Sequence, residues 1–300
     1  MTSFPAASRV VGLAGTQGSP RARQRPSLLV HVWRSPTGRL GLVLSALIAV
    51  MVLFGPLVVS HPPDQLALAE KLRPPSPTHL LGTDQFGRDQ FARLLEGGRR
   101  SLGAAILVLA GSLLISLSLG LTAGMASGVV DAAIMRVVDV ILALPRLVLA
   151  LAVVGMLGPG FPNLLLALTL SSWAFNARIA RSLVLSAHAR PDVIAAEMAG
   201  IPTATIVIGH ILPGVIAQLL VVATLEMGEI IVGLSSLSFL GLGAQPPTAE
   251  WGSMLSDSRV FFDTAPWLLA SPACAIIASV SAANLLGDAI RDAADPRGLT

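Results

Sequence analysis

Two acidic side chains, Glu226 and Glu229, lie one helical turn apart inside a long apolar run of this 300-residue sequence. An ionisable side chain within a membrane span costs roughly 2.5–3.5 kcal/mol on insertion scales and usually faces the bundle interior or a water-filled path. Two like charges at this spacing also repel each other. The pair therefore has two interpretations. In the first, the pair lines a path for a cationic solute. In the second, which we favour, it makes a structural contact with an arginine on a neighbouring span or on a partner chain.

A short amphipathic segment interrupts two apolar runs after residue 188. It is too short to span a bilayer. Its small side chains let another protein approach closely, its acids can reach basic groups, and a glycine can end its helix. The residues that we assign to this docking loop are Asp192, Ala195, Ala196, Glu197, Gly200, His210, Leu212 and Pro213. The alternative is an amphipathic helix on the membrane surface, but such helices usually carry more basic residues than the single Arg190 found here.

Other kinds of chemistry lack the residues that they need. Lys71 is the only lysine and no glycine-rich stretch precedes it, so we expect no P-loop ATP site in this chain. Cys274 is the only cysteine, which excludes an intrachain disulfide and a cysteine metal cluster. The five histidines follow no His-x-x-x-His spacing, and no Gly-x-Ser-x-Gly elbow occurs. We therefore expect no catalytic residue, no cofactor and no metal site.

The composition indicates an all-α integral membrane protein. Hydrophobic residues make up 53% of the chain and charged residues 12%, and the mean hydropathy is +0.75. Several windows hold about 20 apolar residues, the length that crosses the hydrocarbon core as a helix. The formal charge of +3 comes with arginines that flank these windows, where basic residues set topology. We therefore expect the lipid bilayer, and not nucleic acid, as a partner.

Six transmembrane helices are predicted, with both termini in the cytoplasm. Arg34 and Arg39 precede the first, and basic residues favour the cytoplasmic side. The predicted spans are Leu40–Val59 and about Leu102–Met125, Val137–Leu157, Leu164–Leu185, Ile208–Gly233 and Pro266–Leu286. The predicted segments are a disordered basic cytoplasmic tail (1–36), a first transmembrane helix (37–60), an outer segment (61–100), a five-helix domain (101–290) with a cytoplasmic loop at about 188–209, and a cytoplasmic tail (291–300).

Charged residues also lie at the predicted helix ends. Arg136 and Asp139 stand near the start of the third span. Either they form a charge contact that closes the cytoplasmic end, or they anchor the end of the helix, which we favour. Arg178 and Arg181 are expected to mark the cytoplasmic end of the fourth span by snorkelling, and they are further candidates for charge contacts at that end.

The predicted outer segment carries a further group of charges. Asp84, Arg88 and Asp89 follow one another closely in the sequence. They contact a partner protein or form an internal charge network, and we favour the network.

Ordered motifs from residue 79 onward resemble those of one family. Ala195–Gly200, Ala-Ala-x-x-x-Gly, with the later Leu212-Pro213, is similar to the cytoplasmic "EAA" loop of ABC-importer permeases. The other matching stretches are His79–Asp89 with Arg93, Asp131–Pro145, Trp173 with Arg178 and Arg181, Leu237–Gly252, and Asn284–Arg297. Together they resemble the second permease subunit of dipeptide, oligopeptide and nickel importers.

The resemblance implies a type I ABC importer permease fold and a transport subunit that is not itself an enzyme. With a second homologous permease, the chain would form a pathway for di- or oligopeptides across the plasma membrane of a prokaryote. Two separate ATP-binding subunits, which carry the ATP and Mg, would dock on the cytoplasmic loop. A substrate-binding protein outside the cell would deliver the cargo.

Two positions depart from the family pattern. The first position of the loop motif, acidic or polar in the family, is Ile194, and we expect Asp192 or Glu197 to supply that charge instead. Many members of the family carry glutamate where Leu234 stands. A nickel or metallophore importer permease remains an alternative, because its motifs are similar. A secondary transporter driven by an ion gradient is another, with the two glutamates of the fifth span as proton carriers. The internal repeats that would support such a transporter are not evident.

Overall fold

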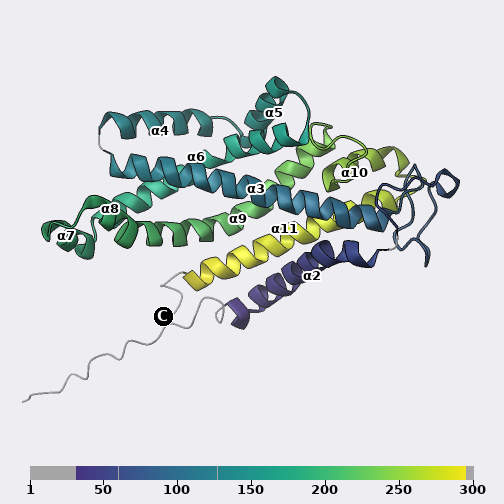
Figure 1. Cartoon of the computed structure of the whole chain (residues 1–300), viewed down its shortest axis with the longest axis horizontal. Helices are drawn as coiled ribbons and strands as arrows, with labels where there is room; N and C mark the ends of the chain where they lie inside the picture. Colours follow the sequence, from purple (N-terminus) through teal and green to yellow (C-terminus); the bar gives the residue numbers. More distant parts are fainter. Residues whose placement is uncertain (1–31, 60, 127, 295–300) are drawn as a thin grey trace, which may run out of the picture.

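The computed structural model describes residues 32–59, 61–126 and 128–294 (Figure 1). The predicted tail at 1–36 therefore lies almost wholly outside the described residues, and the predicted tail at 291–300 is described only as far as Ala294. Within the described ranges the regular structure is helical, apart from one isolated antiparallel bridge between Thr83 and Asp89. The predicted all-α class is confirmed for this part of the chain.

The helices follow the order of the predicted spans. The long ones are α2 (Pro36–Val58), α3 (Gln90–Met125), α4 (Val129–Leu142), α5 (Arg146–Leu157), α6 (Phe161–His188), α9 (Leu212–Phe239) and α11 (Trp267–Ala294). Shorter ones are η1 (Leu68–Glu70), α7 (Pro191–Met198), α8 (Thr203–Ile206), η2 (Val207–Ile211), α10 (Trp251–Ser258) and η3 (Arg259–Phe261).

The number of membrane spans differs from the simple expectation of six. Among the described helices four are long and apolar enough to cross a membrane: α2, α3, the helix that runs through α8, η2 and α9, and α11. The predicted third span, Val137–Leu157, is not one straight helix, because α4 and α5 meet at 93°. Pro145 explains this break, since proline lacks an N–H and disfavours the helical conformation of the residue before it. The bent pair is a fifth candidate span.

Small residues bring α3 and α6 together over most of their length. The two helices run in the same direction, with Gly111 beside Thr169 near one end and Gly124 beside Val184 near the other. A Cβ on Gly120 would lie 2.5 Å from the Cβ of Ala180. Side chains of this size allow helix backbones to approach closely, which is how helices pack in lipid.

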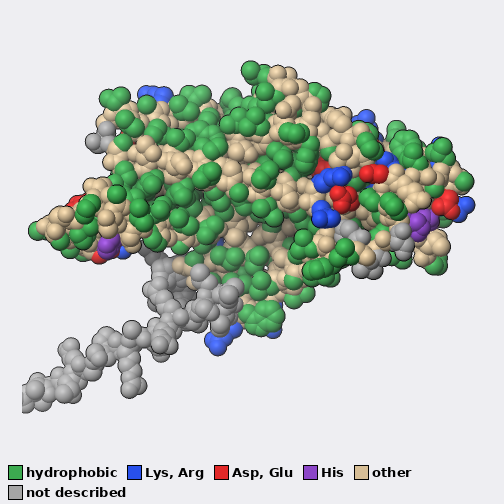
Figure 2. All heavy atoms as spheres, in the orientation of Figure 1, with side chains coloured by type: hydrophobic (Ala, Val, Ile, Leu, Met, Phe, Trp, Pro, Cys, Tyr) green, Lys and Arg blue, Asp and Glu red, His purple; other side chains and the backbone are tan. Residues whose placement is uncertain are grey.

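The two ends of the bundle are formed by different elements, and an apolar flank lies between them. In Figure 1, α7 and α8 lie at one end, and the loops between α2 and α3 lie at the other. α2 and α11 are antiparallel neighbours, with Gly38 beside Ala289, so the start of α2 and the end of α11 lie at the α7 end. Figure 2 shows hydrophobic side chains over the flank of the helices and a charged cluster near the α2–α3 loops. An apolar flank between two more polar ends suits a membrane.

The close contact of α3 with α6 predicts the effect of single methyl groups. Gly120→Ala should destabilise the isolated chain by about 1–3 kcal/mol, because the added methyl clashes with α6. Gly103→Ala, on the same helix, should be neutral or stabilising, because a Cβ there meets nothing within 4 Å and alanine favours helix. Unfolding of both variants in a detergent titration measures the difference. Equal effects at both positions would contradict the packing described.

Candidate functional site

The acidic pair of α9 meets an arginine from another helix. Arg146, the first residue of α5, places Nη2 3.0 Å from Glu226 Oε1 and Nη1 3.0 Å from Glu229 Oε2. The side chain of Glu226 is only 5% exposed, whereas that of Glu229 is 71% exposed. Glu226 thus lies inside the bundle, and Glu229 at its edge.

A third helix completes this charge cluster. Asn176 of α6 is fully buried and donates its Nδ2 to Glu226 Oε2. Glu226 therefore has a partner on each oxygen, as a buried carboxylate requires. Arg146 and Asn176 are the residues that reasoning from sequence missed. The sequence did hold a signal for Arg146, because a charged residue directly after Pro145 marks the break between two apolar helices.

Two hollows adjoin the cluster. One, of about 500 Å³, is lined by Arg146, Ser172, Glu229 and Asn284 among others, and the second, of about 510 Å³, by Arg146, both glutamates and Arg291. Both glutamates contact Arg146, and Glu229, which is exposed, also lines both hollows.

Ion pairs also join α4 to α6. Arg178 Nη2 pairs with Asp139 Oδ1, and Arg181 forms two hydrogen bonds to Asp131, at 2.5 and 2.6 Å. Asp139, Arg178 and Arg181, all candidates for charge contacts, thus form ion pairs between α4 and α6. Arg136 is exposed and has no ion pair among the described residues. Val138, the residue before Asp139, packs against α6 beside these ion pairs.

The docking loop forms a short helix between two bends. α7 begins with Pro191, and Gly200 follows it with φ +75°, a conformation that glycine adopts without strain. Pro202 then precedes the first residue of α8, and Pro213 lies in the first turn of α9. The expected role of Gly200 as the end of the helix matches this geometry.

The two faces of α7 differ sharply. Val193 and Ala196 are buried in a cluster with Val184 of α6 and with Ile206 and Ile211 from the start of the next long helix. Ala196 therefore anchors α7 to its own chain and is not open to another protein, which corrects its expected role. On the outward side Ile194 is 44% exposed and Met198 85% exposed, and Ala195 is exposed beside them.

The charges of the docking loop are largely satisfied within it. Arg190 holds Asp192 with hydrogen bonds of 3.0 and 2.6 Å, and these lower the pKa of that carboxyl below its ordinary value. His210 Nδ1 lies 3.7 Å from the same carboxylate, so Asp192 joins the start of α7 to the segment before α9. Glu197 lies 3.9 Å from the ring of His188. Asp192 therefore links the start of α7 to the segment before α9.

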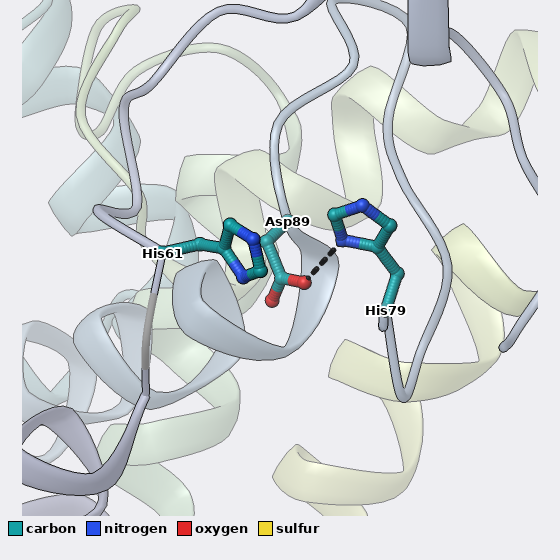
Figure 3. A group of neighbouring side chains, drawn as sticks. All are labelled: His61, His79 and Asp89. Atoms are coloured by element: carbon teal, nitrogen blue, oxygen red, sulfur yellow. Dashed lines mark hydrogen bonds and ion pairs between the residues drawn. The ribbon is translucent and has the colours of Figure 1, made fainter. Parts of the chain in front are cut away.

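At the other end of the bundle the charges form the internal network that we favoured. Asp84, Arg88 and Asp89 are all buried, and Arg88 Nε lies 2.6 Å from Asp84 Oδ2. The structure also places His61 and His79 beside Asp89 (Figure 3). Sequence spacing could not show this grouping, because the three residues come from separate loops and one helix end.

Comparisons with known proteins fit this geometry. Residues 116–298 match the family of binding-protein-dependent transport system inner membrane components, and the chain belongs to this family.

Three curated relatives cover most of the chain. It is 40% identical to the nickel transport system permease protein NikC of Escherichia coli (strain K12), over 87% of this chain and 95% of that protein. It is 39% identical to the dipeptide transport system permease protein DppC of Alkalihalophilus pseudofirmus, over 86% and 84%. It is also 39% identical to the di/tripeptide transport system permease protein DppC of Pseudomonas aeruginosa, over 91% and 93%. The chain is thus an inner-membrane permease of the nickel and dipeptide ABC importer family.

The pairing of Glu226 predicts a stability effect that one further substitution reverses. Arg146→Gln should lower the free energy of unfolding by about 3 kcal/mol, because it leaves a buried carboxylate without its counter-charge. Adding Glu226→Gln should restore most of this loss. Glu229→Gln, at the exposed partner, should change the stability by less than about 1 kcal/mol. Denaturant titration of the purified variants tests all three, and a double variant no more stable than Arg146→Gln would contradict the pairing.

Proposed function

We propose that this chain is one of two different permease subunits of a binding-protein-dependent ABC importer, and that it couples to separate ATP-binding subunits through α7. The observation that carries the proposal is the outward face of α7. Ile194, Ala195 and Met198 form an exposed apolar surface at the end of the bundle away from the α2–α3 loops. Exposed apolar patches with polar rims mark interaction sites.

The attachment of α7 suits a coupling role. Val193 and Ala196 pack α7 against α6, and Arg190 with Asp192 ties it to the segment that leads into α9. A force on α7 therefore reaches two of the three helices that hold the Glu226 cluster, α6 and α9. In this proposal the α7 end faces the cytoplasm, so both described ends of the chain lie on the cytoplasmic side. The membrane is then the plasma membrane of a prokaryote, crossed six times: by the five candidate spans, with α4 and α5 as one bent span, and by α6.

Peptides are the cargo that we propose. Two of the relatives are named for dipeptide or di/tripeptide transport. The exposed carboxylate of Glu229 beside the two hollows adds an acidic group that can attract the charged amino terminus of a peptide. A binding protein outside would deliver this cargo to the end that carries the α2–α3 loops.

Nickel or a metal chelate is the second candidate cargo. It is supported by the relative named for nickel transport, and the same carboxylate suits a cation. Competition separates the two candidates: excess dipeptide should block uptake of labelled dipeptide and leave uptake of radioactive nickel unchanged. Glu229→Gln should reduce uptake of the true cargo several-fold and leave assembly of the complex intact. Unaltered uptake of every cargo would contradict a role for Glu229 in the pathway.

Gentle detergent purification of the tagged chain from its native membranes tests the assembly. Mass spectrometry should find a second permease and ATPases that carry P-loops. Recovery of the chain alone, from membranes where it still supports uptake, would overturn the proposal.

A cysteine placed on α7 should cross-link to one of these ATPases. The chain has one native cysteine, so Cys274→Ser gives a clean background. In that background Met198→Cys should form a cross-linked product with an ATP-binding subunit, because Met198 is 85% exposed on the proposed docking face. Leu66→Cys, 65% exposed near the other end, is the matched control and should form none. Equal cross-linking at both positions, or at Leu66 alone, would contradict docking on α7.

A further inference from the structure

Two histidines and an aspartate converge where the loops after α2 meet the start of α3 (Figure 3). His61 lies three residues beyond the end of α2, His79 belongs to the following loop, and Asp89 is the residue directly before α3. One ligand atom from each lies within 4.8 Å of the others, and the two imidazole rings have centroids 5.0 Å apart. Imidazole nitrogen with carboxylate oxygen is a donor set typical of zinc and related metal ions.

Hydrogen bonds already orient two of these three ligands. His79 Nε2 lies 3.2 Å from Glu70 Oε2, which leaves Nδ1 facing Asp89 Oδ2 at 2.7 Å. The other oxygen of Asp89 accepts a hydrogen bond of 2.7 Å from the backbone N–H of Ala92. A histidine whose second nitrogen is held by a carboxylate is the usual arrangement around a protein-bound metal, because it fixes the tautomer and the ring.

Burial and chemistry both favour a cation at this point. The side chains of His79 and Asp89 are only 7% and 5% exposed, so their donor atoms are shielded from water. A metal ion on Nδ1 of His79 would lie beside Asp89 Oδ2, while Nε2 keeps its contact with Glu70.

We propose that His61, His79 and Asp89 bind one divalent ion of the zinc and nickel class, with Glu70 as the residue that positions His79. A tetrahedral ion about 2.1 Å from each donor needs donors roughly 3.4 Å apart, so the site contracts on binding. His61 is the half-buried member and moves inward. The bound ion then fastens the end of α2, the His79 loop and the start of α3 to one another. This site is separate from the proposed pathway and does not depend on the identity of the cargo.

The test is calorimetry on the full-length chain, purified with a tag that contains no histidine and stripped with a chelator. Zn²⁺ and Ni²⁺ should each bind with about one equivalent, and Mg²⁺, which prefers oxygen ligands, should not. His61→Ala should weaken Zn²⁺ binding at least about tenfold, because it removes one of three protein ligands. This variant leaves the hydrogen bonds of His79 and Asp89 in place. His210→Ala removes a histidine from the docking loop and should bind Zn²⁺ as the unaltered chain does.

Thermal unfolding gives an independent readout, because an ion that binds the folded chain raises its melting temperature. Zn²⁺ should raise the melting temperature of the unaltered chain and of His210→Ala, and have little effect on His61→Ala. No saturable binding of either ion to the unaltered chain would overturn the proposal. The same affinity in His61→Ala as in the unaltered chain, or a loss only in His210→Ala, would also overturn it.

Discussion

A carboxylate inside an apolar bundle needs counter-charges and donors that other helices bring to it, and the arrangement around Glu226 depends on this need. Arg146 comes from α5 and Asn176 from α6, so one buried side chain of α9 fixes the relation of three helices. The bend at Pro145 is part of the same arrangement, because it makes Arg146 the first residue of α5. Elsewhere the bundle is held by small residues, as where Gly120 of α3 lies against Ala180 of α6. Close packing supplies most of the contact, and the charge cluster supplies its specificity.

The docking loop has an inner side that packs on the bundle and an outer side that is exposed. Val193 and Ala196 seat α7 on the bundle, and the Arg190–Asp192 pair closes the loop on itself, so its outward apolar side chains remain free for a partner. α6 packs against α7 at one end and carries Asn176 towards its middle. In the proposed coupling role, a movement of α7 would be transmitted along α6 to the Glu226 cluster. This route consists of packed side chains and hydrogen bonds, the kind of connection through which rigid helices carry a displacement.

The sequence predicted the helical class, the positions of the long helices and the loop with its Gly200 bend, because apolar run length and glycine chemistry are local properties. It also predicted that Asp84, Arg88 and Asp89 form an internal charge network. It did not predict the break of the third span into two helices at 93°, although Pro145 was visible, because the angle depends on how α4 packs on α6. The same holds for Ala196, whose buried position depends on which face of α7 meets the bundle, and for the grouping of His61 with His79. Each depends on contacts between distant segments, which spacing along one chain does not record.

Transport driven by ATP is the central claim, and release of peptide from sealed vesicles that contain the purified complex tests it most directly. Vesicles with the ATPases facing outward, the binding protein inside and labelled peptide loaded with it should export peptide only when ATP and Mg²⁺ are added. An ionophore that collapses proton and sodium gradients should have no effect on this movement. Transport that continues without ATP and stops with the ionophore would contradict the account and would instead favour a carrier driven by an ion gradient.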